Sequence, residues 1–226
     1  MQYSLDYSEN VTLPDGTDLR FRSIRPDDKP ALVEAFARLS AESRRRRFFT
    51  TKNHLSEDEL RYLTECDGIN HYAIVAGKES PGAPTEGIGV ARFVRVPEEP
   101  QAAELAIVVV DKWQNRGIGS MLLERLVRAA AERGIREIRA LALPDNAQIR
   151  SLLEHYADDV EVLEDHGMLL MTVHVPPVDE EDALDAMLSM LRYAALGTFI
   201  IPIWLGRRTL QQLLAQMEQK DPGEEE

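Results

Sequence analysis

The residues of this chain best suited to chemistry form a turn between an apolar run, 102–110, and an amphipathic stretch. This order predicts a buried strand that leads directly into a helix. The N–H groups of a helix's first turn lack partners within the helix, the helix dipole adds positive potential, and glycine lets a phosphate approach the backbone closely. The turn is therefore a candidate pyrophosphate cradle, and a tight turn without a ligand is the alternative. It consists of Gln114, Asn115, Arg116, Gly117, Ile118, Gly119 and Ser120.

Two side chains could act beside this turn. Arg116 can add a charge-assisted contact to a bound phosphate. Glu104 is the one polar residue within the apolar run, where desolvation would raise the pKa of its carboxyl group. Such a carboxylate suits a general base that takes a proton from an amine, directly or through a water. The alternatives are that Glu104 faces solvent at the start of the strand or pairs with an arginine.

Several other site types do not fit the sequence. The dinucleotide-binding pattern Gly-x-Gly-x-x-Gly fails at Gln114, and the loop Gly-x-x-x-x-Gly-Lys-Ser/Thr is missing. The five histidines show no metal-ligand spacing, so we expect no metal site. Cys66, the single cysteine, cannot form an internal disulfide, and residues 1–10 do not resemble a secretory signal. We therefore expect a reducing, cytoplasmic setting.

The elements that must position these residues can be predicted from periodicity and capping. Apolar alternation and runs predict the strands, and amphipathic stripes that begin at capping residues predict the helices. Ser56 and Glu59, for example, form a capping box. The order predicts a mixed α/β (α+β) fold. Strands are expected at 19–24, 71–76, 88–96, 102–110 and 138–143, and helices from 27, 40, 56 and 145. A long helix is expected after the turn at 114–120, ending near Gly134, together with a loop at 77–87 and a hairpin at 160–175 that turns at His166-Gly167.

The segment from Glu104 to Gly119 resembles motif A of the GNAT N-acetyltransferase superfamily. The family pattern Gln/Arg-x-x-Gly-x-Gly/Ala is matched here by residues 114–119, and the similarity of element order extends from about Leu19 to Val175. Asn146 matches the asparagine that often opens the helix after the fifth strand. Details at 103–106, at 111–114 and in the arginine-rich stretch ending at 47–49 are most similar to GNAT domains of bacterial protein-lysine acetyltransferases.

This resemblance implies a splayed central sheet flanked by helices, with acetyl-CoA as cosubstrate. The pantetheine arm would lie in the gap after the strand that ends near Val110, and the pyrophosphate would sit on the N–H groups of residues 115–120. A backbone N–H near Val108, Val109 or Val110 would hold the oxyanion. Related lysine acetyltransferases place their glutamate at the position of Glu104.

Two departures from the family pattern concern the acceptor side. Many GNAT enzymes carry a tyrosine seven residues after the asparagine as general acid, but Leu153 stands there, and Tyr156 lies one helical turn further. The Gly-Phe pair that often follows this helix is replaced by residues 157–159, Ala-Asp-Asp. The leaving thiolate would then depart unassisted or take a proton from water.

The charge balance and the C-terminal segment limit the partners. The net charge of -13 disfavours nucleic acid and tolerates a cationic acceptor. Residues 1–176 form the predicted acetyltransferase domain. Residues 177–226 form a helical extension, apolar and amphipathic, with an acidic tail. Its part 183–226 could pack on its own domain or a second subunit, lie on a membrane surface, or span one, although its uncharged part is short for a span.

The sequence therefore predicts direct transfer of an acetyl group from acetyl-CoA to an amine. By resemblance the acceptor is a protein lysine, and a small amine is the alternative. A non-catalytic module that binds acetyl-CoA is a third hypothesis, which the missing tyrosine favours.

Overall fold

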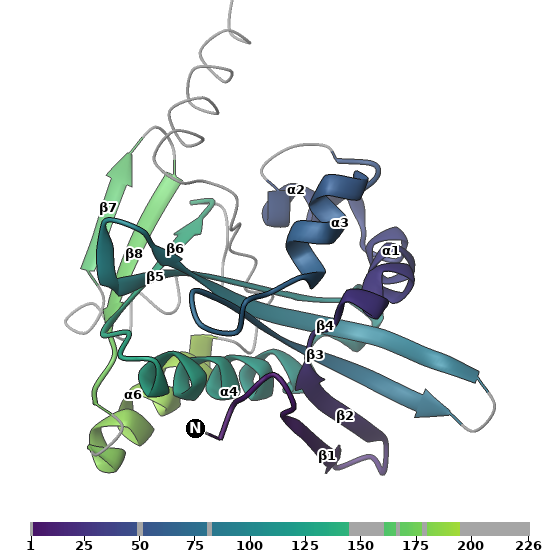
Figure 1. Ribbon diagram of the computed structural model, residues 1–226, viewed down its shortest axis with the longest axis horizontal. Coiled ribbons are helices and arrows are strands. Elements are labelled where there is room, and N and C mark those ends of the chain that lie inside the picture. The colour runs from purple at the N-terminus through teal and green to yellow at the C-terminus, as the bar shows by residue number, and fades with distance from the viewer. Residues whose placement is uncertain are drawn as a thin grey trace, which may run out of the picture.

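A computed structural model describes residues 2–48, 52–80, 83–144, 161–165, 168–177 and 180–194. Within these residues an eight-stranded sheet has the order β1-β2-β3-β4-β5-β6-β8-β7 (Figure 1). Its strands are β1 (Ser8–Thr12), β2 (Asp18–Ser23), β3 (His71–Ser80), β4 (Ala83–Val96), β5 (Glu99–Val109), β6 (Glu137–Ala142), β7 (Glu161–Asp165) and β8 (Met168–His174). The helices are η1 (Pro26–Asp28), α1 (Lys29–Ala37), α2 (Ala41–Phe48), α3 (Glu57–Thr64), η2 (Asp111–Trp113), α4 (Ile118–Glu132) and α6 (Glu181–Ala194).

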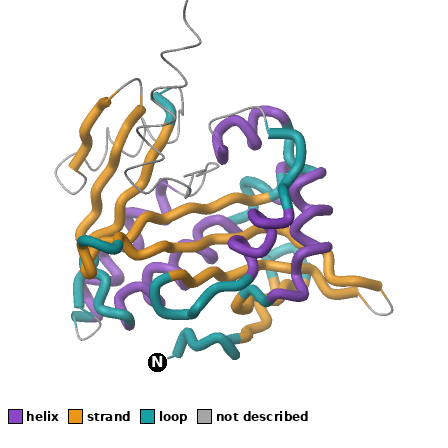
Figure 2. The backbone as a smooth tube through the Cα atoms, turned by 45° about the horizontal axis from the view of Figure 1, so that its top comes forward, coloured by secondary structure: helices purple, strands orange, loops and turns teal. Residues whose placement is uncertain are grey.

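The sheet opens between β5 and β6. These two strands run parallel and are in register only from Ala102↔Glu137 to Glu104↔Arg139, whereas the other neighbours pair antiparallel. Figures 1 and 2 show β6, β7 and β8 turning away from β3, β4 and β5 beyond this short contact. The expected mixed, splayed sheet flanked by helices is thus confirmed, and Glu104 marks the point where its two halves part.

Helices cover both faces of the sheet. Figure 1 shows α4 and α6 on one face and α1, α2 and α3 near the other. The amphipathic pattern of α4 buries Leu122, Leu126 and Val127 in the main core, and Gly134, at φ 72°, follows the end of the helix. The capping box at α3 is confirmed, because Glu59 N–H donates to Ser56 Oγ at 3.3 Å and Ser56 N–H to the Glu59 carboxylate at 2.8 Å.

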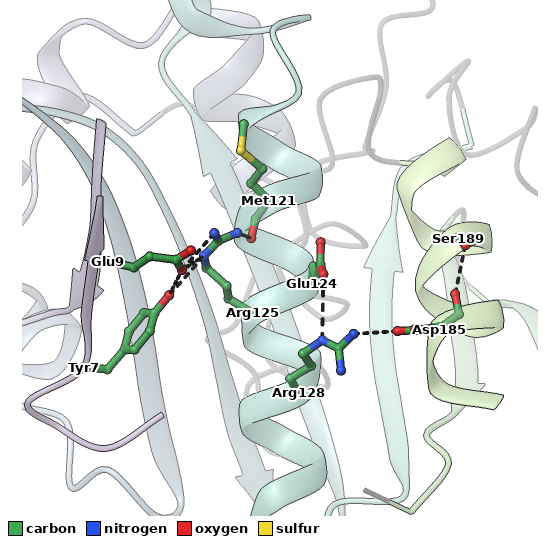
Figure 3. Close-up of polar contacts among 8 residues, drawn as sticks. All are labelled: Tyr7, Glu9, Met121, Glu124, Arg125, Arg128, Asp185 and Ser189. Atoms are coloured by element: carbon green, nitrogen blue, oxygen red, sulfur yellow. Dashed lines mark hydrogen bonds and ion pairs between the residues drawn. The ribbon is translucent and has the colours of Figure 1, made fainter. Parts of the chain in front are cut away.

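The outer side of α4 is held by segments far apart in the sequence (Figure 3). Arg125 Nε donates to Tyr7 Oη and to a Glu9 carboxylate oxygen, each at 3.0 Å, which attaches the N-terminal segment. Arg128 Nη2 donates to Asp185 Oδ1 at 2.5 Å on α6. Leu184, Met187 and Leu188 of α6 are buried in the same core as α4. The described part of the C-terminal segment therefore packs on the domain that precedes it.

One prediction about the elements was wrong, one strand was not predicted, and other predictions fall outside the described residues. The expected loop 77–87 is instead the continuation of β3 to Ser80 and the start of β4 at Ala83. Glycine suits this hairpin, since a Cβ at Gly77 would lie 2.6 Å from Thr85 Cγ2 across the strands. Strand β1 was not predicted. The hairpin at 160–175 is confirmed by the pairing of β7 with β8.

The helix predicted to open at Asn146, with Leu153 and Tyr156, lies outside the described residues, as do residues 195–226. In the part of the chain that is described, no helix has both the length and the apolar character that a membrane crossing requires.

Candidate functional site

The predicted cradle is a backbone turn shaped by two positive φ angles. Asn115 has φ 59° and Gly117, the N-cap of α4, has φ 78°. The first hydrogen bond of α4 runs from Met121 N–H to Gly117 C=O at 3.0 Å. The N–H groups of the preceding residues therefore stand outside the helical hydrogen-bonding pattern, at the positive end of the helix dipole. This geometry suits an anion such as a pyrophosphate.

The start of this turn is tied to β5 and to α2. Gln114 Nε2 donates to Val109 C=O at 2.9 Å. Asp111 accepts hydrogen bonds from Ser43 Oγ and from Ser40 N–H, each at 2.9 Å. Ser43 is buried, and Asp111 keeps a pKa below its usual value because these bonds outweigh desolvation. Sequence reasoning missed this link, since nothing in the spacing of Ser43 and Asp111 indicates contact.

Trp113 and Arg116 pack beside the cradle. Trp113 is only 6% exposed, and the Arg116 guanidinium lies 4.6 Å from the centre of its ring. Arg116 also forms an ion pair with Asp15. The role of Arg116 in binding phosphate stays a prediction, because its guanidinium is directed to these two partners.

The backbone of β5 presents alternate residues to the gap. Val110 N–H donates to Ile88 C=O at 2.8 Å, so it faces β4, while Gln101 C=O accepts from Arg136 N–H at 2.7 Å and faces the other edge. Alternation along the strand directs the N–H of Val109 to the opening and that of Val108 to β4. Of the three predicted oxyanion donors, Val109 therefore has the suitable orientation, and Val110 is already bonded.

Glu104 lies at the apex of the opening. It is half-buried, and desolvation raises the pKa of its carboxyl group to about 7, an effect that Arg139 partly opposes. In the described part of the chain, no hydrogen bond or salt bridge reaches its carboxylate. The predicted rise in pKa is confirmed, and neither pairing with an arginine nor full solvent exposure describes this residue.

Arg139 stands beside Glu104 on β6 but is bound elsewhere. Its Nη1 donates to Glu99 Oε1 at 3.0 Å, its Nη2 to the second oxygen of the same carboxylate, and its Nε to Glu137. These hydrogen bonds raise the pKa of Arg139 above its usual value. Only the alternation Glu137-x-Arg139 could have indicated this cluster from the sequence, because Glu99 lies on another strand.

The remaining reactive side chains have structural roles. Burial raises the pKa of the Cys66 thiol to about 11 and lowers that of His71 to about 3. Arg44 packs over the Phe36 ring at 4.9 Å and donates to carbonyls at the end of α1. Among the described residues, no group of three or more acidic, histidine or cysteine side chains is arranged to hold a metal ion.

These features fit an extended thioester cosubstrate with a pyrophosphate. The cradle would hold the diphosphate, and the gap beside β5 would hold the arm between Val109 and Glu104, which lie about 17 Å apart at the usual strand rise. Gly117 suits the cradle, since its φ of 78° strains any residue with a Cβ. Asn146, predicted to contact the same molecule, lies outside the described residues.

Comparisons with known proteins agree with this geometry. The family model for the acetyltransferase (GNAT) domain matches residues 18–156. Acetyltransferase Pat of Mycolicibacterium smegmatis is 34% identical over 158 residues, 70% of this chain and 46% of that protein. An acetyltransferase of Pseudomonas aeruginosa is 28% identical over 141 residues, 62% of this chain and 75% of that protein. The crystal structure of the GNAT domain of S. lividans PAT matches with a TM-score of 0.63 and 29% identity, covering 74% of this chain and 96% of that one.

The chain belongs to the GNAT acetyltransferase family, whose cosubstrate is acetyl-CoA. It spans about half the length of the M. smegmatis relative.

Proposed function

We propose that this chain is an acyl-CoA-dependent N-acetyltransferase that modifies lysine side chains of proteins. The observation that carries the proposal is Glu104, a half-buried carboxyl group with a pKa of about 7 at the apex of the opening. A base of this kind is half ionised near neutral pH and can accept a proton from an amine. The choice of lysine is supported by the likeness to acetyltransferases named Pat and by the acidic net charge.

The proposed reaction is direct transfer without an acyl-enzyme intermediate. The amine nitrogen attacks the thioester carbonyl, and Glu104 accepts the proton that the nitrogen loses, directly or through a water. The N–H of Val109 faces the gap, but it lies about 17 Å from Glu104 along β5 at the usual strand rise. It would therefore donate to the arm of the cosubstrate rather than to the oxyanion beside Glu104. The carbon–sulfur bond then breaks, and coenzyme A leaves as a thiolate that takes its proton from water.

The test is turnover by the purified full chain. Acetyl-CoA is supplied with lysine-containing peptides, with polyamines or with free amino acids, and thiol release is followed together with the mass of the acceptor. We expect acetylated lysine peptides with the wild type and a large loss of rate in Glu104→Gln. Acetylation of the small amines alone would show that the acceptor is a small amine. No turnover with any acceptor would refute the proposal that the chain is an enzyme.

A second hypothesis is a module that binds acetyl-CoA without catalysis. It is favoured by Leu153, which stands where many relatives carry the tyrosine that protonates the thiolate. This hypothesis predicts tight binding of acetyl-CoA, no turnover, and no effect of Glu104→Gln. Steady turnover with any amine would exclude it.

Location and assembly are proposed from the cysteine content and from the C-terminal segment. A cytoplasmic location rests on the single cysteine, Cys66. If the segment 183–226 contacts a second subunit, light scattering should show a dimer. If it contacts a membrane surface, the chain should bind liposomes, and this binding should be lost when the segment is deleted. Burial of Leu184 and Leu188 against α4 favours an intramolecular role for the first part of that segment.

A further inference from the structure

An arginine lies next to the proposed base without binding it. Glu104 of β5 and Arg139 of β6 are the last pair in register before the strands part, so their side chains leave the same face of the sheet. Opposite charges paired on neighbouring strands attract each other and can form a charge-assisted hydrogen bond. Here the Arg139 guanidinium lies close enough to act electrostatically on Glu104, but no hydrogen bond joins them among the described residues.

Two other carboxylates occupy the guanidinium. Glu99 binds two of its nitrogens in the bidentate arrangement, and Glu137 accepts from Nε. Glu137 lies two residues before Arg139 on the same strand, and Glu99 begins β5. The fork of the guanidinium is therefore directed to two carboxylates other than that of the proposed base, and its donors are largely used.

No other described charge takes the place of Arg139. The β4 residue opposite Glu104 is Val94, which is apolar. Arg92, two residues earlier on β4, is fully buried and donates to His71 Nε2 and to Leu63 C=O. The ionisation of Glu104 is thus governed by burial and by one cation whose position Glu99 and Glu137 fix.

We propose that Glu99 and Glu137 are positioning residues that hold the Arg139 guanidinium out of a salt bridge with Glu104, which leaves this carboxylate available to accept a proton. Without them, Arg139 would turn to Glu104 and stabilise its ionised form. A carboxylate so paired is a weaker base, because its charge is satisfied before the amine arrives. The catalytic meaning of this arrangement rests on the proposed function, but the arrangement itself does not.

The test follows the titration of Glu104 directly. In the full chain labelled with carboxyl-¹³C glutamate, NMR spectra are recorded from pH 4 to 9, and the Glu104 signal is identified by its loss in Glu104→Gln. We expect a midpoint near 7 in the wild type. We expect a midpoint about one pH unit lower in Glu99→Gln/Glu137→Gln, since an unbound arginine at short range lowers a carboxyl pKa by about this much. Glu98→Gln, an exposed neighbour, serves as the matched control and should leave the midpoint unchanged.

Removing two negative charges could also lower the midpoint without moving Arg139. The same pair of substitutions is therefore made in an Arg139→Gln background, where the proposal predicts that most of the shift disappears. Arg139→Gln alone should raise the midpoint above that of the wild type. The proposal is overturned if the shift is equally large in both backgrounds, or if the double variant titrates like Glu98→Gln.

This design distinguishes a failure of the positioning proposal from a failure of the proposed function. The titration needs neither acetyl-CoA nor an acceptor, so it remains decisive if no acetyl transfer is found. If the chain is active, the acidic limb of kcat/KM against pH should move by the same amount as the Glu104 midpoint. Should the double variant not fold, the single variant Glu99→Gln gives the same comparison, because its side chain is 38% exposed on a hairpin and tolerates the change.

Discussion

Replacing Glu104 with glutamine tests the proposed base most sharply when pH is varied. Glutamine keeps the shape of glutamate but cannot accept a proton from the amine. The acceptor amine also ionises, and this contributes equally to wild type and variant. The ratio of their kcat/KM values at each pH therefore isolates the ionisation of Glu104.

The structure sets the size and position of this change. With a pKa of about 7, Glu104 is ionised to about one-tenth at pH 6 and about nine-tenths at pH 8. The ratio should rise about tenfold over this interval and level off above pH 8. On the plateau it should lie between about 10² and 10⁴, the usual contribution of a general base.

The assay is release of coenzyme A thiol with a lysine peptide as acceptor, from pH 5.5 to 9. Glu98→Gln provides the control, since it makes the same chemical change at an exposed position. A ratio close to unity would show that Glu104 is not the base. A ratio well above unity that is already constant from pH 5.5 upward would show that burial does not raise the pKa of Glu104.

Three further predictions concern stability and cofactor affinity. Because burial raises the pKa of Glu104 from 4.5 to about 7, the folded state binds its proton more tightly than the unfolded chain, and stability falls as pH rises between these values. Glu104→Gln should therefore be stabilising by about 3 kcal/mol at pH 8 and nearly neutral at pH 4, measured by urea denaturation. Ser43→Ala removes the bond to Asp111 and should weaken acetyl-CoA binding by about 1 kcal/mol in calorimetry. Leu188→Ala should cost about 2–4 kcal/mol of unfolding free energy and Asp185→Asn less than about 1 kcal/mol, and equal costs would contradict the packing of α6.

The fold and the centre of the site could be predicted from the sequence where the signal is local. The apolar run, the turn at 114–120 and the stripe of α4 are contiguous, so their periodicity and glycines indicate strand, turn and helix in order. The burial of Glu104 followed from its place in that run. The capping box at Ser56 likewise depends on four neighbouring residues.

Features that depend on pairing between distant segments could not be predicted. The glycines of 77–87 indicate a loop, yet they permit close strand approach in a hairpin. The orientation of the Val109 N–H depends on which edge of β5 pairs with β4 and in what register. The sequence of the strand alone does not determine either. The links Ser43–Asp111 and Glu99–Arg139 join residues on different elements, so only the folded chain brings them together.

Calorimetric titration of acetyl-CoA into wild type and Gly117→Glu shows whether the turn before α4 holds the pyrophosphate of acetyl-CoA. The substitution places a carboxylate at the cradle and strains a backbone with φ 78°. Gly134→Glu is the matched control, because Gly134 has φ 72° beyond the opposite end of the same helix. We predict micromolar or tighter binding by wild type and Gly134→Glu and none by Gly117→Glu. Equal binding by all three proteins, or none by the wild type, would show that this turn is not the pyrophosphate site.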